Sequence, residues 1–368
     1  MFDRFREFAE AFCLNGEDLI LTETPMYEGY IKALSLPCHV ILKDKYSKGE
    51  PDEDTVNAIL MDMKGMDLKR VIAIGGGSVI DIAKVICVRD AYPIKDVMYH
   101  RTPPVHDKEL IVLPSTCGTG SEVTFGGIIT MKDTGFKTAI MDSTLVSRHA
   151  VLIPELLQGL PYRVFVHCSI DALGHSMESF VSSTRGNEFA RAAGARSIKL
   201  LTEGYAKLAA DGESAKDALL ESFIQASCLG GLAVNNGGAG PVHALAYPLG
   251  EVYHMSHGES IYEFLTEVFI HYERTKGGEL LEELAGIIRP ALHKAGITEE
   301  SAFKGLEILL DKVYPNRPLS DAGMKEEDIV PFTDNIFEAK QRLLQASYSE
   351  FTREDAMRIY SNRLYSRR

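Results

Sequence analysis

The sequence of 368 residues lacks the features that mark several common classes of protein. Its six cysteines are scattered and form no Cys-x-x-Cys pair, which argues against a zinc ribbon and against a disulfide framework. Six free thiols fit a reducing cytoplasm. The net charge is −13, so no excess of lysine and arginine favours nucleic acid or an anionic membrane surface as a partner.

Long apolar runs and targeting signals are also missing. No run of about 20 apolar residues suggests a membrane span. The amino-terminal segment is charged and amphipathic, and it lacks the basic start and apolar stretch of a secretory signal. We therefore expect a cytoplasmic protein.

The composition that remains, 45% apolar and 25% charged, is typical of a soluble globular protein. The chain is too long for one ordinary core, so we expect two domains. Residues 1–160 alternate between strand-like and helix-like segments, which predicts an α/β domain with a parallel, doubly wound sheet. Residues 161–368 form successive amphipathic patterns, which predict an all-helical domain. We expect a ligand in a cleft between the two domains.

The elements of the first domain follow from its apolar patterns. The predicted strands are 18–23, 39–44, 70–76, 109–116, 126–132, 137–142 and 150–156. Helices are predicted at 26–34, 51–66 and 78–88.

Two loops after predicted buried strands have a composition suited to a dinucleotide. In the first, Gly75-Gly76-Gly77-Ser78 lets the backbone approach a ligand, and the exposed N–H groups of the following helix attract a phosphate. Asp81 and Lys84 lie on the first turns of that helix. The pattern is not Gly-x-Gly-x-x-Gly, so this loop does not have the glycine fingerprint of an ordinary Rossmann fold.

The second loop, residues 114–124 (PSTCGTGSEVT), is rich in hydroxyls and glycines. Taken alone, the first loop could equally be a tight turn, and the second could be a helix-capping loop. Two such loops at the ends of adjacent strands favour a dinucleotide site.

Two groups of potential metal ligands occur in the helical part. Asp171 and His175 are four residues apart and share one face of a predicted helix. His243, His254 and His257 fall within fifteen positions. A single Asp-His pair or a lone histidine is more often structural, but the two groups together favour a metal site. Ligands of this kind, without a thiolate, suit Fe(II), Zn(II) or Mn(II), and they do not select among these ions.

Four segments, in this order and spacing, resemble the iron-containing (group III) alcohol dehydrogenase family. They are residues 75–84 (GGGSVIDIAK), 114–124, 171–180 (DALGHSMESF) and 243–258 (HALAYPLGEVYHMSHG). The resemblance covers nearly the whole chain. Within the family it extends to the 4-hydroxybutyrate dehydrogenase branch, through the segment 247–259, the segment 323–329 (GMKEEDI) and the tail QRLL…FTRED.

The resemblance implies a dehydroquinate synthase-like architecture, with a dinucleotide-binding domain followed by an all-helical domain that holds the metal. By position, it implies the metal ligands Asp171, His175, His243 and His257. It also implies cofactor contacts from Glu23, Gly76, Gly77, Ser78, Asp81, Ser115, Thr116, Thr124 and Lys137. Glu23 stands where the family has an aspartate near the adenosine ribose, and an acid there favours NAD over NADP. Fe(II) is the metal that the family favours, with Zn(II) as the alternative.

The chain departs from the family pattern at Tyr247. Most relatives have a histidine there, four residues after the first histidine of the cluster, and it is a candidate proton carrier. The predicted replacements are Tyr247, His254, or the cofactor ribose together with water. The tail also has Ser347-Tyr348-Ser349 in the region where the family has Asn-Pro-Arg, which indicates a changed substrate pocket.

The resemblance implies the interconversion of 4-hydroxybutyrate and succinate semialdehyde with NAD(H), by a homo-oligomer that is a dimer or larger. The substrate carboxylate would need a cationic or multi-donor pocket, for which Arg163 and Arg342 are candidates. The alternatives are a dehydrogenase for an uncharged diol or simple primary alcohol, of the 1,3-propanediol or butanol type, a lyase related to dehydroquinate synthase, and a metal-binding scaffold without activity. The ligand spacing disfavours the lyase, and the retention of both cofactor loops disfavours the scaffold.

Overall fold

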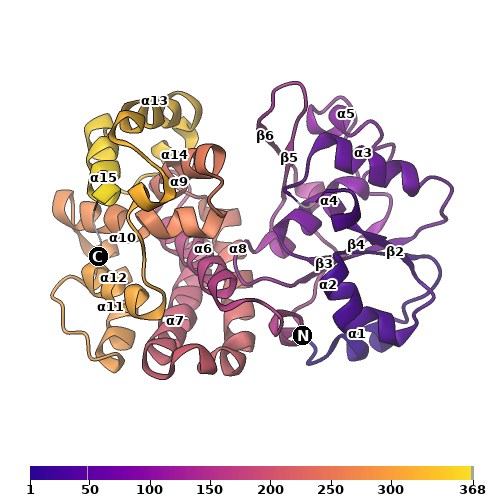
Figure 1. The fold of residues 1–368 in the computed structure, drawn as a ribbon, viewed down its shortest axis with the longest axis horizontal. Helices are drawn as coiled ribbons and strands as arrows, with labels where there is room; N and C mark the ends of the chain where they lie inside the picture. The colour runs from indigo at the N-terminus through magenta and orange to yellow at the C-terminus, as the bar shows by residue number, and fades with distance from the viewer. Residues whose placement is uncertain (48, 366–368) are drawn as a thin grey trace. The chain divides into compact units, whose positions relative to one another are not determined.

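The computed structural model describes residues 1–47 and 49–365. The chain divides into two compact units, Met1–Gly159 and Leu160–Arg368. In the described residues, every strand belongs to the first unit and the second is built of helices (Figure 1). The predicted fold class, an α/β part followed by an all-α part, is confirmed.

The first unit is organised around a five-stranded parallel sheet with the strand order β2-β1-β3-β4-β7. Its elements are α1 (Phe5–Ala11), β1 (Asp18–Thr22), α2 (Thr24–Met26), β2 (His39–Leu42), α3 (Glu53–Asp62), β3 (Arg70–Gly75), α4 (Gly77–Ile86), α5 (Ile94–Met98), β4 (Glu109–Pro114), β5 (Gly126–Thr130), β6 (Lys137–Met141) and β7 (His149–Ala150). All four strand pairs in this sheet are parallel. The carboxyl ends of β1, β3 and β4 therefore lie at one edge, where a ligand of such a sheet is expected.

The strands predicted at 126–132, 137–142 and 150–156 differ from the prediction in their pairing or their length. β5 and β6 pair antiparallel in a separate two-stranded sheet, because a short turn with Gly135 in the left-handed region (φ 70°) reverses the chain between them. The strand predicted at 150–156 is reduced to the two residues of β7, followed by a single 3₁₀ turn at Pro154–Leu157. Proline has no N–H for a strand ladder, so the strand cannot continue through Pro154 as predicted.

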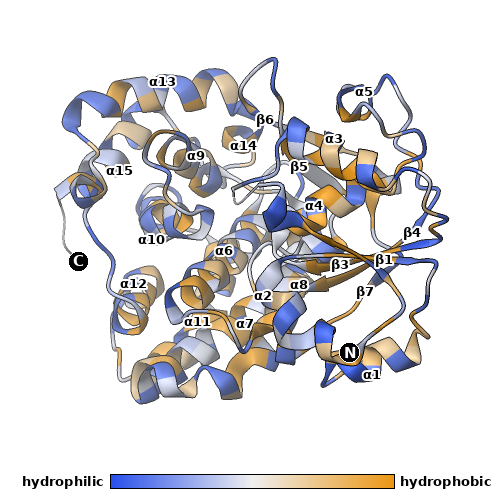
Figure 2. Ribbon diagram, turned by 45° about the vertical axis from the view of Figure 1, so that its right-hand side comes forward, coloured by the Kyte–Doolittle hydropathy of each residue, from blue (hydrophilic) through white to orange (hydrophobic). Residues whose placement is uncertain are grey.

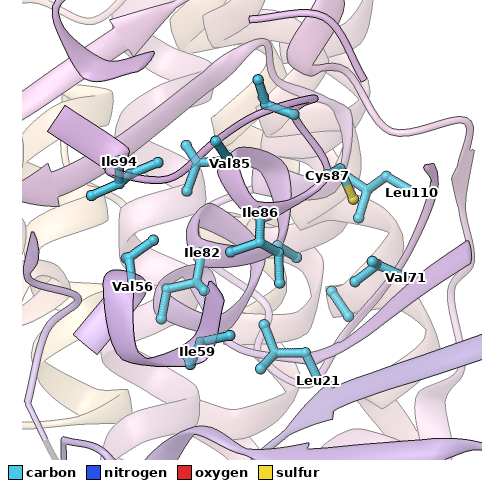
Figure 3. Packing of buried hydrophobic residues seen from close by; sticks show 14 of the residues in the cluster. Leu21, Val56, Ile59, Val71, Ile82, Val85, Ile86, Cys87, Ile94 and Leu110 are labelled. Atoms are coloured by element: carbon cyan, nitrogen blue, oxygen red, sulfur yellow. The ribbon is translucent and has the colours of Figure 1, made fainter. Parts of the chain in front are cut away.

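The core of the first unit lies between one face of the sheet and the helices α3 and α4. Figure 3 shows Leu21 and Val71 of the sheet packed against Ile59 of α3 and Ile82 and Ile86 of α4. The central strands β1, β3 and β4 each begin with a charged residue and continue with at least three consecutive apolar residues (Figure 2). Strands that are covered on both faces need this continuous apolar pattern, which is why they could be identified from the sequence.

The second unit consists of helices that pack mainly on one another. They are α6 (Tyr162–Val181), α7 (Glu188–Asp211), α8 (Leu220–Gly237), α9 (Pro241–Tyr253), α10 (His257–Thr275), α11 (Glu279–Lys294), α12 (Ala302–Val313), α13 (Ile329–Ala339), α14 (Gln341–Gln345) and α15 (Arg353–Tyr365). The long helix α6 packs against α7, α8 and α10. Of the last eleven residues of α6, only His175 is not buried. The polar side chains of this part of the helix, such as Asp171, therefore lie inside the helical unit.

One helix has the length and the mean hydropathy of a membrane span, although it is not a continuous apolar run. The helical segment Asp217–Gly237 meets both criteria. Half of its apolar window is buried inside the protein, where α8 packs against α6 and α7. The high hydropathy of this helix is explained by its packing against α6 and α7.

Candidate active site

Three helices bring the predicted metal ligands together in the second unit. Asp171 and His175 lie one turn apart on α6, His243 lies in the first turn of α9, and His257 is the first residue of α10. The Oδ1 atom of Asp171 lies 3.8 Å from Nε2 of His175, 3.6 Å from Nε2 of His243 and 3.4 Å from Nε2 of His257. The three predicted histidine ligands therefore surround one carboxylate oxygen of the fourth, Asp171.

The spacing of these atoms fits a divalent ion. Metal–ligand bonds of about 2.1 Å in a tetrahedral site place neighbouring donor atoms about 3.4 Å apart. One donor atom each of Asp171, His175 and His243 lies within 4.8 Å of the others. His257 is the outer member, because its side chain is 43% exposed. Its exposure suits a ligand at the open side of the site.

Buried atoms of the cluster have no hydrogen-bond partner in the part of the chain that is described. They include Oδ1 of Asp171 and Nε2 of His243. A buried polar atom without a partner costs free energy that a bound ion would recover. Burial by itself raises the pKa of Asp171, but the neighbouring histidines outweigh it and lower that pKa far below its ordinary value. The site therefore favours a negative carboxylate next to positive charge, and the donor set fits a divalent metal.

Glu178 is a residue of the site that the sequence analysis did not identify. It is buried on α6, two turns beyond Asp171, and its Oε2 atom lies 2.5 Å from Nδ1 of His243. Its Oε1 atom accepts a hydrogen bond from the backbone N–H of Val242 at 2.6 Å. This carboxylate holds the ring of His243 so that Nε2 faces Asp171. Metal-binding histidines commonly have such a carboxylate on the ring nitrogen that does not bind the metal. Burial lowers the pKa of His243, but Glu178 and Asp171 together raise it to about 9.

The spacing of Glu178 could have revealed it. Asp171, His175 and Glu178 are separated by four and then three residues, which places all three on one helical face.

A close helix contact sets the position of His257. The next residue, Gly258, is pressed against α6, and a Cβ atom built on it would lie 2.2 Å from the carbonyl oxygen of His167. Only glycine permits this approach, so α10 begins directly against the turn that precedes Asp171.

The two predicted proton carriers lie at different places. The Tyr247 ring centroid lies 6.4 Å from that of His257, which puts Tyr247 beside the cluster. His254 follows the last turn of α9 in the left-handed region (φ 53°) and is exposed. No contact between its side chain and the cluster is found among the described residues. The geometry thus favours Tyr247 over His254.

The two arginines considered for the substrate carboxylate lie at the surface of the helical unit. Arg163 is held by Glu259, at 2.7 Å and 2.8 Å from its two carboxylate oxygens. Arg342 lies on α14 and is exposed. Neither arginine has a described contact with the Asp171 cluster.

The two predicted cofactor loops lie against each other in the first unit. Strands β3 and β4 are neighbours in which Gly75 faces Pro114, and the N–H of Ser115 donates to the carbonyl of Gly75 at 2.9 Å. A Cβ atom on Gly77 would come within 3.0 Å of the Thr119 methyl group, so glycine is needed where α4 begins. The first amides of α4 have no side-chain cap, which suits a phosphate. This edge brings together Gly76, Gly77, Ser78, Ser115 and Thr116.

A buried lysine, to which the sequence analysis assigned no role, fastens the second loop to α4. The Nζ atom of Lys84 donates to Oγ of Ser121 at 2.9 Å, to Oγ1 of Thr124 at 3.0 Å and to the carbonyl of Gly126 at 2.6 Å. Asp81 accepts from Ser121 Oγ at 2.8 Å. Burial lowers the pKa of Lys84 to about 8. Asp81 and Thr124 thus have protein partners that hold the loop, and their predicted contact with a cofactor stays a prediction.

The two remaining cofactor candidates are in ion pairs. Glu23 follows the end of β1, and its Oε1 atom lies 3.9 Å from Nζ of the buried Lys43. Lys137, at the start of β6, donates to Glu50 at 2.7 Å. Glu23 is therefore at the same edge of the sheet as the glycine loop.

Two family models match this chain. One, described as iron-containing alcohol dehydrogenase, matches residues 5–154. The other, described as the carboxyl-terminal part of the Fe-containing alcohol dehydrogenase family, matches residues 165–364.

Curated relatives agree with these matches. The chain is 38% identical to a 4-hydroxybutyrate dehydrogenase of Clostridium kluyveri over 363 residues, which cover 98% of this chain and 96% of that protein. It is 30% identical to alcohol dehydrogenase 4 of Saccharomyces cerevisiae over 321 residues, covering 85% of this chain and 81% of that protein.

Solved structures share the fold. A 1,3-propanediol oxidoreductase superposes with a TM-score of 0.81 at 21% identity, over 97% of this chain and 94% of that one. A sulfoacetaldehyde reductase of Bifidobacterium kashiwanohense in complex with NAD⁺ gives 0.76 at 22% identity, over 98% and 94%.

Proposed function

The chain belongs to the iron-containing alcohol dehydrogenase family, and we propose that it interconverts 4-hydroxybutyrate and succinate semialdehyde with NAD(H). The observation that carries the proposal is the match to a 4-hydroxybutyrate dehydrogenase along 98% of the chain. The buried Asp171 cluster supports it, because it supplies donors for the divalent ion that such a reaction uses.

In the proposed reaction, 4-hydroxybutyrate and NAD⁺ give succinate semialdehyde, NADH and a proton. When bound, a divalent ion supplies Lewis-acid polarisation of the substrate oxygen, and the dinucleotide supplies the hydride acceptor. Asp171, His175, His243 and His257 would hold the ion, and Glu178 orients His243. Tyr247 borders the cluster and is the nearer of the two predicted proton carriers.

The proposed cofactor is NAD rather than NADP. The carboxylate of Glu23 lies at the end of β1, next to the strand that leads into the glycine loop. A carboxylate at this position of a dinucleotide fold accepts from a ribose 2′-hydroxyl and repels a 2′-phosphate.

The substrate is tested with three aldehydes under identical conditions. NADH oxidation is measured with succinate semialdehyde, butanal and 3-hydroxypropanal. We expect kcat/KM for succinate semialdehyde to exceed that for the two uncharged aldehydes by at least about tenfold, the value of one charged hydrogen bond. Equal values for succinate semialdehyde and butanal would refute the proposal and would indicate a dehydrogenase for an uncharged alcohol.

A further inference from the structure

A lysine of the helical unit lies against the Tyr247 ring, which borders the Asp171 cluster. Lys340 directly follows the last residue of α13, and its Nζ atom lies 4.0 Å from the centroid of the Tyr247 ring. Its side chain is half-buried, and no ion pair or hydrogen bond of its ammonium group is found among residues 1–47 and 49–365. A lysine in such a place usually keeps a carboxylate close, because burial weakens its hydration.

The backbone of Lys340 is held in place from both sides. Its N–H donates to the carbonyl of Ile336 at 2.9 Å, and its carbonyl accepts from the N–H of Leu343 at 2.9 Å and that of Leu344 at 3.2 Å. The residue therefore joins α13 to α14 at a fixed point, and α14 in turn packs against α9, which carries Tyr247 and His243.

The ammonium group is close enough to the cluster for a small hydroxy acid to reach both. The Tyr247 ring centroid lies 4.0 Å from Lys340 Nζ and 6.4 Å from the His257 ring centroid, so Nζ is within about 10 Å of that imidazole. An extended chain of four carbons spans about 6 Å between its terminal oxygens, and a charged hydrogen bond adds about 3 Å. One molecule can therefore approach the histidines with its alcohol end and Lys340 with its carboxylate.

The other cations considered for this role are less suitable. Arg163 is neutralised by Glu259, and Arg342 is exposed two residues beyond Lys340. Lys340 alone among the three lies against a side chain of the site. Its ring contact contributes some stability of its own, but a cation over one aromatic face keeps the rest of its ammonium group available to a ligand.

We propose that Lys340 binds the carboxylate of the substrate and selects a carboxylate-bearing aldehyde over an uncharged one. This inference rests on the proposed function, because it assigns a residue to the acid group of 4-hydroxybutyrate. It makes Lys340 a determinant of specificity, since it contacts the end of the substrate that does not react.

The test compares Lys340→Met with Lys340→Arg and with a matched control, Lys325→Met. Lys325 is exposed and pairs with Glu327, so its loss removes one positive charge from the same unit without touching the site. For each holoenzyme, kcat/KM is measured with succinate semialdehyde and with butanal. Calorimetry measures the binding of 4-hydroxybutyrate to the holoenzyme, and metal content and NADH affinity are measured as controls of integrity.

Lys340→Met should lower the preference for succinate semialdehyde over butanal about 10- to 100-fold, the effect of one hydrogen bond to a charged group. Its affinity for 4-hydroxybutyrate should fall by a similar factor, and kcat/KM for butanal should stay within about twofold. Lys340→Arg should keep most of the preference, and Lys325→Met should keep all of it.

Two results would overturn the role of Lys340 while leaving the proposed function intact. In one, the wild type prefers succinate semialdehyde and Lys340→Met keeps that preference. In the other, Lys340→Met loses activity on both aldehydes equally, which is the effect of a merely structural residue. If the wild type itself shows no preference, the proposed function fails, and the role of Lys340 fails with it.

Discussion

In the first unit, the groups expected to hold a dinucleotide are backbone amides and hydroxyls at the ends of β3 and β4, and the register of the sheet brings them together. In the second unit, the metal cluster consists of side chains from α6, α9 and α10, and only the packing of these helices brings them together. Single substitutions in one unit should therefore affect one ligand and spare the other. Measuring metal and NADH binding separately tests this division.

The largest effect is expected from Asp171→Asn. Asp171 Oδ1 is the atom around which all three histidines gather, and asparagine removes its charge. We expect loss of bound metal and a fall in activity of about 1000-fold or more. NADH binding, measured by fluorescence, should be unchanged. Parallel loss of NADH binding would show that the two units do not act separately.

Glu178→Gln should give the next largest effect. The amide keeps the shape of Glu178 but removes the charge that orients His243. We expect metal affinity to fall about 10- to 100-fold, measured by competition with a chelator. Glu279→Gln, at the start of α11, is the matched control and should bind metal like the wild type. Unchanged metal affinity in Glu178→Gln would contradict its role.

Lys84→Met tests whether a change in the first unit weakens NADH binding and leaves metal binding unchanged. It removes three hydrogen bonds that fasten the second cofactor loop to α4. We expect the Kd for NADH to rise about tenfold and the free energy of unfolding to fall by about 1.5–3 kcal/mol. Metal content should stay the same. Lys64→Met, at an exposed position, is the control. A drop in metal content in Lys84→Met would contradict the separation of NADH binding and metal binding between the two units.

The smallest effect is expected from Glu23→Gln. The amide can still accept from a ribose hydroxyl, but it no longer repels a 2′-phosphate. The ratio of kcat/KM with NADH to that with NADPH should fall about threefold to tenfold. Glu28→Gln, at an exposed ion pair with Lys32, should leave the ratio as it is. A ratio unchanged by Glu23→Gln would remove the basis for predicting NAD.

The sequence predicted the parts of the fold that depend on short-range patterns. The apolar strands β1, β3 and β4 and the glycines at the start of α4 are visible in a few consecutive residues, so their positions could be anticipated. The antiparallel pairing of β5 with β6 could not, because either sheet accepts the same alternation of residues and the turn decides between them.

The candidate site shows the same limit. Asp171 and His175 are visible as a helical pair, but the orientation of His243 depends on Glu178, whose contact crosses between two helices. Lys340 lies far from the histidine cluster in the sequence, and no motif marks it. Such contacts between distant segments follow from packing, which periodicity alone does not determine.

The most direct test of the account is metal reconstitution of the enzyme. The protein is stripped with a chelator, and NADH oxidation with succinate semialdehyde is followed while Fe(II) or Zn(II) is added. The account predicts that the stripped enzyme binds NADH but is inactive, and that activity returns and saturates at about one metal ion per chain. Full activity of the stripped enzyme, or no recovery with either ion, would contradict it.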